Sequence, residues 1–205
     1  KSMPDGTAVA LEENMRTLTQ YALRSGAGDA AVISASDIVI DAGLAERCRK
    51  PRCENYGLSK SCPPHVAGPA ALEQDLERFS RAIFFKIDVP SEVLYSSERR
   101  EVFQLLHEIA SGIERRAVDM GFSDARAFAG GSCKKIFCRE HLQCRVLSEN
   151  GQCRHPEHAR PSMSGFGIHV AALFKTVGWT MNGFMQNPDA TTTRTASVCG
   201  LVLIH

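Results

Sequence analysis

The fold is decided by one apolar stretch in the middle of the chain, Ala82-Ile83-Phe84-Phe85-Lys86-Ile87-Asp88-Val89. Its length and its β-branched and aromatic residues predict a buried strand, which ends at Pro90. Helical periodicity predicts a helix on each side of it along the chain, over residues 69–81 and over residues 97–120. Gly121 closes the second of these helices, which is the longest that we expect.

Shorter apolar segments further from this stretch predict three more strands. The run at 196–204 is apolar throughout and predicts a second buried strand. Residues 125–129 predict a short strand that leads into Gly130-Gly131. The remaining strand is expected in two parts, 31–33 and 37–41, with a break near residues 34–36.

Two further helices are expected over residues 7–25 and 167–177, because their apolar residues recur at helical spacing. Helices and strands therefore alternate along the chain. This order predicts an α/β or α+β fold with a central mixed or parallel sheet of about four to five strands covered by helices. We expect a single layered domain over residues 1–205, with cysteine-containing loops at strand ends.

The charge balance of the chain is nearly neutral, with 24 Lys and Arg against 23 Asp and Glu and a net charge of +1. Such a balance gives no global attraction to nucleic acid or to an anionic membrane, so we expect neither as a partner. No apolar run approaches the roughly 20 residues that span a bilayer. The first residues lack the apolar stretch of a signal peptide, and we expect a cytoplasmic protein.

Eight cysteines are present, and seven of them fall into two groups. The eighth, Cys199, lies within an apolar strand, where we expect a buried structural thiol. In a reducing compartment, clustered thiols indicate metal ligands or redox groups more than disulfides. The seven grouped thiols are therefore our candidate metal and cofactor ligands: Cys48, Cys53, Cys62, Cys133, Cys138, Cys144 and Cys153.

The spacing within the groups favours an iron–sulfur cluster over zinc. The two patterns are Cys48-x4-Cys53-x8-Cys62 and Cys133-x4-Cys138-x5-Cys144-x8-Cys153. Neither contains the C-x2-C pair typical of structural zinc sites. The second group supplies the four thiolates that a [4Fe-4S] cluster needs, whereas the first supplies three and leaves one iron open to another ligand. The sequence allows one cluster or two, a single cluster shared by both groups, or zinc as the alternative metal.

Basic residues surround both groups, and they would stabilise a negatively charged cluster or attract a redox partner protein or a small anionic substrate. Four residues near the cysteines are candidates for catalytic or anion-binding roles. His65 is also a possible fourth ligand of the first group. Tyr56 and Lys60 lie between its cysteines, and Arg160 precedes the expected last helix.

Three segments resemble one known family. They are Cys53-Glu54-Asn55-Tyr56-Gly57 with Cys62-Pro63-Pro64, Cys153-Arg154-His155-Pro156 with Arg160-Pro161-Ser162-Met163, and Gly167-Ile168-His169-Val170. From about residue 31 to residue 204 the chain resembles the prokaryotic predicted metal-binding proteins of domain of unknown function 2284. The resemblance implies metal binding, most plausibly of an iron–sulfur cluster, and implies no particular reaction.

Three functions are consistent with these patterns. The first is an iron–sulfur protein that transfers electrons to a partner enzyme. The second is an enzyme of the lyase, dehydratase or desulfidase type, in which an open-site [4Fe-4S] cluster serves as Lewis acid. The third is a structural or regulatory zinc protein. Whether the protein is an enzyme is left open by the sequence.

Overall fold

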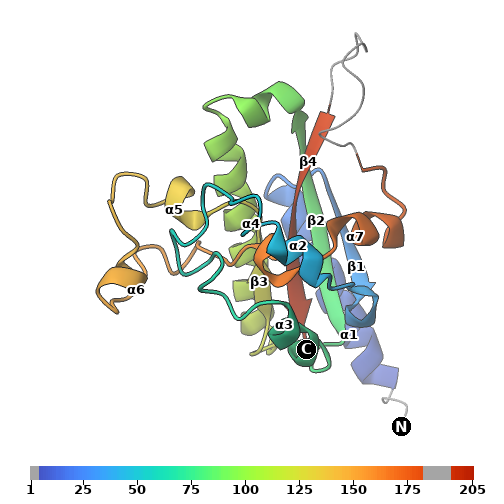
Figure 1. The fold of residues 1–205 in the computed structure, drawn as a ribbon. Helices are drawn as coiled ribbons and strands as arrows, with labels where there is room; N and C mark the ends of the chain where they lie inside the picture. The colour runs from blue at the N-terminus through green and yellow to red at the C-terminus, as the bar shows by residue number, and fades with distance from the viewer. Residues whose placement is uncertain (1–4, 182–194) are drawn as a thin grey trace.

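A computed structural model describes residues 5–181 and 195–205 and shows one four-stranded sheet in the order β1-β2-β4-β3 (Figure 1). The strands are β1 (Asp29–Ser34), β2 (Arg81–Pro90), β3 (Arg126–Phe128) and β4 (Thr195–Ile204). The apolar stretch at 82–89 is β2, and it pairs along its whole length with β4, from Arg81 opposite Ile204 to Pro90 opposite Thr195. The expected layered α/β fold is confirmed, with four strands in the described residues.

The direction of the strands differs from our expectation of a mixed or parallel sheet, because all three strand pairs are antiparallel. β2 and β3 do run in the same direction, and α4 (Arg99–Asp119) connects them as in a parallel crossover. β4 nevertheless lies between them and pairs antiparallel with both. Periodicity along the chain predicted the strands, but it carried no information on the order in which the strands pair in the sheet.

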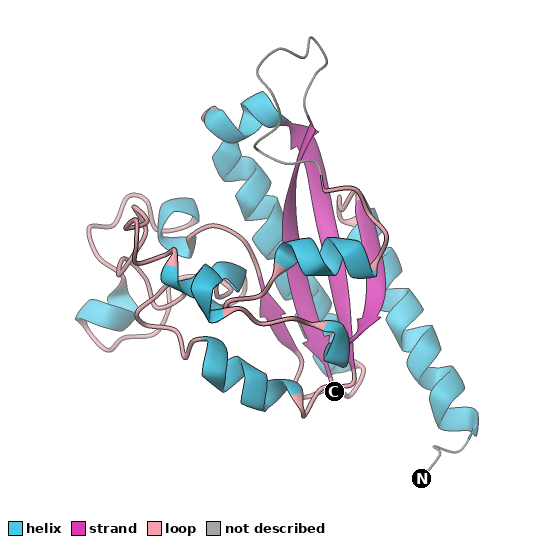
Figure 2. Cartoon of the chain, turned by 45° about the vertical axis from the view of Figure 1, so that its right-hand side comes forward, coloured by secondary structure: helices cyan, strands magenta, loops and turns pink. Residues whose placement is uncertain are grey.

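Helices cover both faces of the sheet (Figure 2). α1 (Asp5–Arg24) and α4 pack with Ile83 and Phe85 on one face. α3 (Pro69–Leu76) and α7 (Val170–Thr176) contribute to the opposite core with Phe84. Successive side chains of a strand point to opposite faces, so the continuous apolar run of β2 fills both cores.

Gly200 in β4 is required by the packing of its cross-strand partner Phe85. A Cβ at Gly200 would lie 2.4 Å from Cζ of Phe85, so the ring occupies the space that a side chain would need. Phe85 is fully buried, and burial of such a ring contributes roughly 2–3 kcal/mol. The glycine therefore allows the two central strands to bury a large aromatic side chain between them and α4.

Several element boundaries differ from those expected. α3 ends at Leu76 rather than at residue 81, and the chain then turns directly into β2. The expected break after β1 is confirmed by the short 3-10 helix η1 (Ala35–Asp37). The strand expected at 37–41 is reduced to one isolated bridge between Ile40 and Ile168. Its partner Ile168 lies just after η3 (Met163–Phe166) rather than in a strand, so the described residues do not extend the pairing.

Three very short helices were not expected, because four or five residues are too few to show helical periodicity. They are α2 (Ala42–Glu46), α5 (Cys133–Ile136) and α6 (Arg145–Ser148). α2 begins where Asp41 Oδ1 accepts the N–H of Gly43 at 2.8 Å, a side-chain cap. In the described part of the chain, no helix has both the length and the apolar character needed to cross a membrane.

Candidate metal centre

Both cysteine groups lie in loops on the same side of the molecule, beyond the β3 edge of the sheet (Figures 1 and 2). We call residues 47–66 the first cysteine loop and residues 130–160 the second. The segment 161–163 joins them. Ala129, at the end of β3, donates its N–H to Pro161 O at 3.0 Å, and Ser162 donates its N–H to Ser61 O at 3.0 Å. The first loop is therefore hydrogen-bonded, through this segment, to the edge of the sheet from which the second loop departs.

The first cysteine loop is a series of turns held by its own backbone. Cys53 donates its N–H to Cys48 O at 3.0 Å, and Cys62 donates to Ser59 O at 3.2 Å. Gly57 donates to Pro63 O at 2.8 Å, which closes the far part of the loop. These turns direct the three cysteines of this group to a cavity of about 200 Å³.

The second cysteine loop is more closed. α5 begins at Cys133, and Cys144 is the residue that precedes α6. Its four cysteines surround a space of only about 20 Å³, which also contacts Phe137. We expected each cysteine group to lie in a loop that leaves a strand and precedes a helix. The structure modifies this expectation for both groups. The short helices α5 and α6 lie within the second group, and α2 lies between β1 and the first group.

The seven thiols form one continuous series in space. The pKa of Cys48 is raised mainly by burial, and further by the neighbouring Cys53 and Cys62. Burial likewise raises the pKa of Cys133, with further contributions from Cys62 and Cys153. The first group therefore adjoins the second where Cys62 lies close to Cys133, and both of these thiols are buried.

The series continues within the second group. The pKa of Cys138 is raised by burial and by the nearby Cys153 and Cys144, although Arg154 and Lys134 oppose the shift. Thiolates that are buried beside one another are unfavourable until a cation neutralises them. A bound metal supplies that charge, because coordination deprotonates the thiols and compensates their burial.

The donor chemistry around the thiols fits a metal centre. All eight cysteines are free thiols. Cys153 Sγ accepts the N–H of His155 at 3.4 Å, a contact that stabilises a thiolate ligand. Within residues 5–181 and 195–205, the buried side-chain polar atoms that lack a hydrogen-bond partner all belong to the cysteine loops: Asn55 Oδ1, Ser59 Oγ, Ser132 Oγ and His158 Nδ1.

Ser59 illustrates this pattern. Its hydroxyl and that of Ser61 lie near enough to lower the pKa of Cys133, yet Ser59 Oγ makes no hydrogen bond of good geometry. Polar groups that are buried without partners are rare in folded proteins and indicate an unaccounted ligand or strain. Here they surround the thiols, which agrees with a polar or charged group bound between the two loops.

The described side chains are not assembled around a single ion. Across the described parts of the chain, no three His, Cys, Asp or Glu side chains lie close enough together to hold one metal ion. Four thiolates on a zinc ion would each lie about 2.3 Å from the same centre. In a cubane cluster each thiolate binds a different iron, so the sulfur atoms lie further apart.

The second loop is anchored to α4 by His107, which is fully buried. Its Nδ1 accepts the N–H of Arg160 at 3.1 Å, so its Nε2 carries the proton and donates to Gly130 O at 3.1 Å. Burial lowers the pKa of His107 to about 4, and the ring is neutral at pH 7. Phe137 packs edge-on against this ring at 5.5 Å and stacks on His155 at 5.4 Å.

Arg160 forms a second anchor. Its Nε donates to Glu114 Oε2 at 2.7 Å, and the two side chains are only 11% and 18% exposed. Glu114 Oε1 also accepts the N–H of Ala127 in β3 at 2.7 Å. The guanidinium of Arg160 is thus engaged by α4 and by loop carbonyls, which favours a positioning role over the anion-binding role that we expected.

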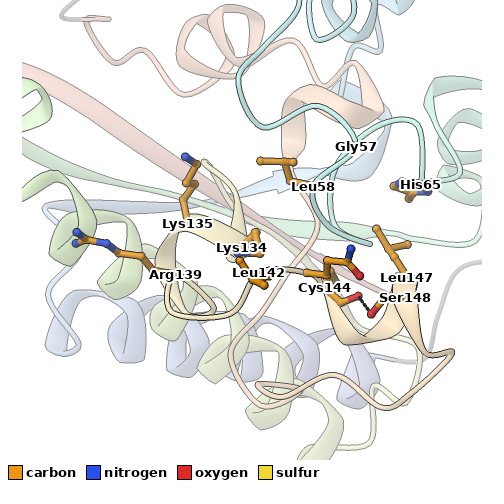
Figure 3. Close-up of a pocket in the computed structure, with 11 residues that line it drawn as sticks. Gly57, Leu58, His65, Lys134, Lys135, Arg139, Leu142, Cys144, Leu147 and Ser148 are labelled. Carbon is orange, nitrogen blue, oxygen red and sulfur yellow. Dashed lines mark hydrogen bonds between the residues drawn. The ribbon is translucent and has the colours of Figure 1, made fainter.

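The other candidates lie at the surface of the first loop. Tyr56 lines the three-cysteine cavity and is half-buried, with Arg52 at 5.7 Å from its ring. Lys60 is exposed. His65 faces a wider cavity of about 470 Å³ between the two loops, opposite Lys134, Lys135 and Arg139 (Figure 3). Cys144 lines the same cavity, so one thiol of the second group borders this open space.

Cys199 is separate from the other seven. It lies in β4 opposite Lys86, is 8% exposed, and burial raises its pKa to about 12. The expected buried thiol is therefore confirmed. The sequence did not identify His107, Glu114 or Phe137 as parts of the site. His107 and Glu114 are polar residues of α4, and the sequence pattern of this helix reported only its apolar face. Phe137 is a single aromatic residue in a cysteine loop, and a single residue forms no pattern.

These features define a cysteine-rich α/β protein whose two cysteine loops form a candidate metal centre beside its sheet. Residues 31–204 match the family described as predicted metal-binding protein (DUF2284), and the chain belongs to this family. The resemblance of the three sequence segments is thereby confirmed. No curated protein and no solved structure matches the chain.

Proposed function

We propose that this metal-binding protein carries iron–sulfur clusters and transfers electrons to a partner enzyme in the cytoplasm. The observation that carries the proposal is that the seven grouped cysteines are free thiols that line the cavities of the two loops, four in one cavity and three in the other. A [4Fe-4S] cluster supplies one-electron chemistry when bound. Cys133, Cys138, Cys144 and Cys153 would hold a complete cluster, and Cys48, Cys53 and Cys62 would hold a second.

The spacing of the cysteines along the chain supports a cluster over zinc, since neither group contains the C-x2-C pair typical of structural zinc sites. The surroundings also suit a redox group. The four thiols of the second loop surround a space of about 20 Å³, which is also lined by Phe137, and Phe137 packs in turn on the neutral His107. Low solvent access and N–H contacts to sulfur are the means by which proteins tune cluster potentials.

A basic surface supports an acidic redox partner. Lys135 and Arg139 line the cavity that reaches Cys144, and none of its described lining residues is a carboxylate (Figure 3). Leu142 in the same cavity is 100% exposed. Exposed cations around an apolar side chain suit a transient complex, because charges steer the encounter and a small apolar contact holds it.

Metal analysis of protein purified without oxygen tests the proposal. We expect iron and acid-labile sulfide in equal amounts, with little zinc and a brown colour. Cys138→Ser should lower both iron and sulfide, whereas Cys199→Ser should leave them unchanged, because Cys199 lies in the sheet. Stoichiometric zinc in a colourless protein without sulfide would contradict the iron–sulfur proposal and favour a zinc site.

A second candidate function, Lewis-acid catalysis, is supported by the first loop. Its three thiols line a cavity of about 200 Å³ with no fourth cysteine among the described lining residues, and Tyr56 lines the same cavity. Such a group would leave one iron accessible to a substrate oxygen or sulfur. Tyr56 would then be a proton donor, whereas Lys60 and His65 lie further out on the loop. A cysteine thiolate on every iron of each cluster, read by Mössbauer spectroscopy as the absence of a distinct open iron, would exclude this function.

A further inference from the structure

A second cavity, of about 220 Å³, lies between the N-terminal end of α4 and the first cysteine loop. Arg99, Arg100 and Lys135 line it, with Glu54 as the one carboxylate among its described lining residues. The cavity therefore carries a net positive charge. It adjoins the three-cysteine cavity, since Asn55, Arg99, Phe103 and Gly131 line both.

The cations of this cavity are held in place. The guanidinium of Arg99 lies 5.4 Å from the centre of the Phe103 ring, a cation–π contact within the first turn of α4. Arg100 Nε donates to Ile136 O at 3.0 Å, which ties α5 to the start of α4. Cations that are already positioned lose less conformational entropy when an anion binds between them.

The start of α4 adds a second source of positive potential. The helix runs for 21 residues, and Glu98 provides no side-chain cap hydrogen bond. The N–H groups of Arg99 and Arg100 reach Ser96 O and Ser97 O at 3.4 Å, which is longer than the ordinary range. Donors that are weakly satisfied at a helix N-terminus favour an anion nearby.

An unpartnered polar side chain points to a ligand independently of the helix. Ser132 lines this cavity, is 3% exposed, and its Oγ has no hydrogen-bond partner in the described part of the chain. A buried hydroxyl costs free energy unless it is hydrogen-bonded, and an oxyanion would accept a hydrogen bond from it.

We propose that this cavity binds a small molecule through an oxyanion group, a carboxylate or a phosphate, and holds it next to Cys48, Cys53 and Cys62. Arg99, Arg100 and the first turn of α4 bind the charge, and Ser132 donates a hydrogen bond. The binding itself needs no metal. A role for the anion as substrate of the three-cysteine site rests on the Lewis-acid function proposed above.

The wider cavity of Figure 3 is a weaker candidate for this role. Lys134 lines it, but its Nζ already donates to Cys138 O at 2.9 Å and to His141 O. Arg139 is exposed, and no long helix of the described chain begins there. Arg139 therefore offers a matched control, a cation in the neighbouring cavity with the same charge as Arg99.

Isothermal titration calorimetry tests the proposal on anaerobically purified full-length protein, with inorganic phosphate and with malonate as separate probes at constant ionic strength. We expect saturable binding of one of the two, and the one that binds identifies the oxyanion class. Arg99→Gln should weaken it at least about tenfold, as expected for a charge-assisted pair. Ser132→Ala should weaken it several-fold, and Arg139→Gln should leave it unchanged.

Two results would overturn the proposal. One is the absence of saturable binding of either anion, and the other is an equal loss of affinity in Arg99→Gln and Arg139→Gln. Circular dichroism checks that the variants fold, and Ser132→Ala removes no hydrogen bond that the described residues make through this hydroxyl. Iron measured on the same samples separates the two proposals, because anion binding by iron-free protein would retain this inference and reject the cluster function.

Discussion

The two cysteine loops carry similar ligands but are built in different ways. The first loop is made of turns, and its three thiols line an open cavity of about 200 Å³. The second contains α5 and α6, encloses its four thiols in about 20 Å³, and packs Phe137 against His107 of α4. Four candidate ligands thus lie in the closed loop, and three lie in the open one.

This difference suggests a division of roles between adjacent centres. A closed loop protects a group that exchanges only electrons, whereas an open cavity admits a molecule to the metal. If both loops bind a cluster, the electrostatic contribution of Cys62 to the raised pKa of Cys133 indicates that the two clusters would lie near each other. The predictions that follow test whether the loops differ in this way, and we order them from the largest expected effect to the smallest.

Single cysteine replacements should have the largest effect, the loss of a whole cluster. If each loop binds its own cluster, Cys53→Ser and Cys138→Ser should each reduce the iron content from about eight to about four atoms per chain. The remaining cluster should differ between the two variants in its electron paramagnetic resonance spectrum. A complete loss of iron in both variants would instead indicate one cluster shared by the two loops, and would end the distinction between them.

Removal of Phe137 should destabilise the protein by about 2 kcal/mol, because this half-buried ring packs on His107, His155 and His158. The matched change in the first loop, Tyr56→Ala, should cost less than about 1 kcal/mol, since Tyr56 contacts Arg52 by a cation–π interaction near the surface. Urea unfolding gives both values. Equal costs would mean that the second loop is not the more tightly packed one.

Acid should loosen the second loop through His107, whose pKa is lowered from 6.5 to about 4 by burial. The unfolded chain binds this proton more readily, so stability is complete above pH 6.5 and is lost as the pH falls toward 4. We expect a loss of about 2 kcal/mol between pH 7 and pH 5. His107→Gln should be less stable at pH 7 and should lack this part of the pH dependence. If the free energy of unfolding of His107→Gln falls with pH as steeply as that of the unchanged protein, His107 is not the group that causes this loss.

The smallest contrast concerns two glycines with positive φ. Gly57 in the first loop has a φ of +79°, and a Cβ added there would have no described atom within 4 Å. At Gly131 in the second loop, with a φ of +74°, an added Cβ would lie 3.0 Å from Cδ1 of Phe103. Gly57→Ala should cost about 1 kcal/mol from backbone strain alone. Gly131→Ala should cost about 2 kcal/mol, because Phe103 must also move. Thermal unfolding of both variants compares them, and equal shifts would mean that Phe103 yields without cost.

Much of the layered core was predictable because periodicity reports which side chains a segment buries. The run at 82–89 became β2, the run at 196–204 became β4, and the helix expected at 97–120 became α4 at Arg99–Asp119. The pairing of these elements was not predictable. β4 enters between β2 and β3 and makes the sheet antiparallel, a choice that depends on contacts between segments far apart in the chain.

The candidate metal centre was also predictable only in part. The spacing of the cysteines along the chain was enough to separate seven grouped thiols from Cys199, because ligands of one centre recur at short intervals while a core thiol lies in an apolar run. Only the tertiary structure placed Cys62 beside Cys133 and set His107, Glu114 and Phe137 around the second loop. These contacts join residues from different elements, and their free energy arises from burial and hydrogen bonding that no local pattern records.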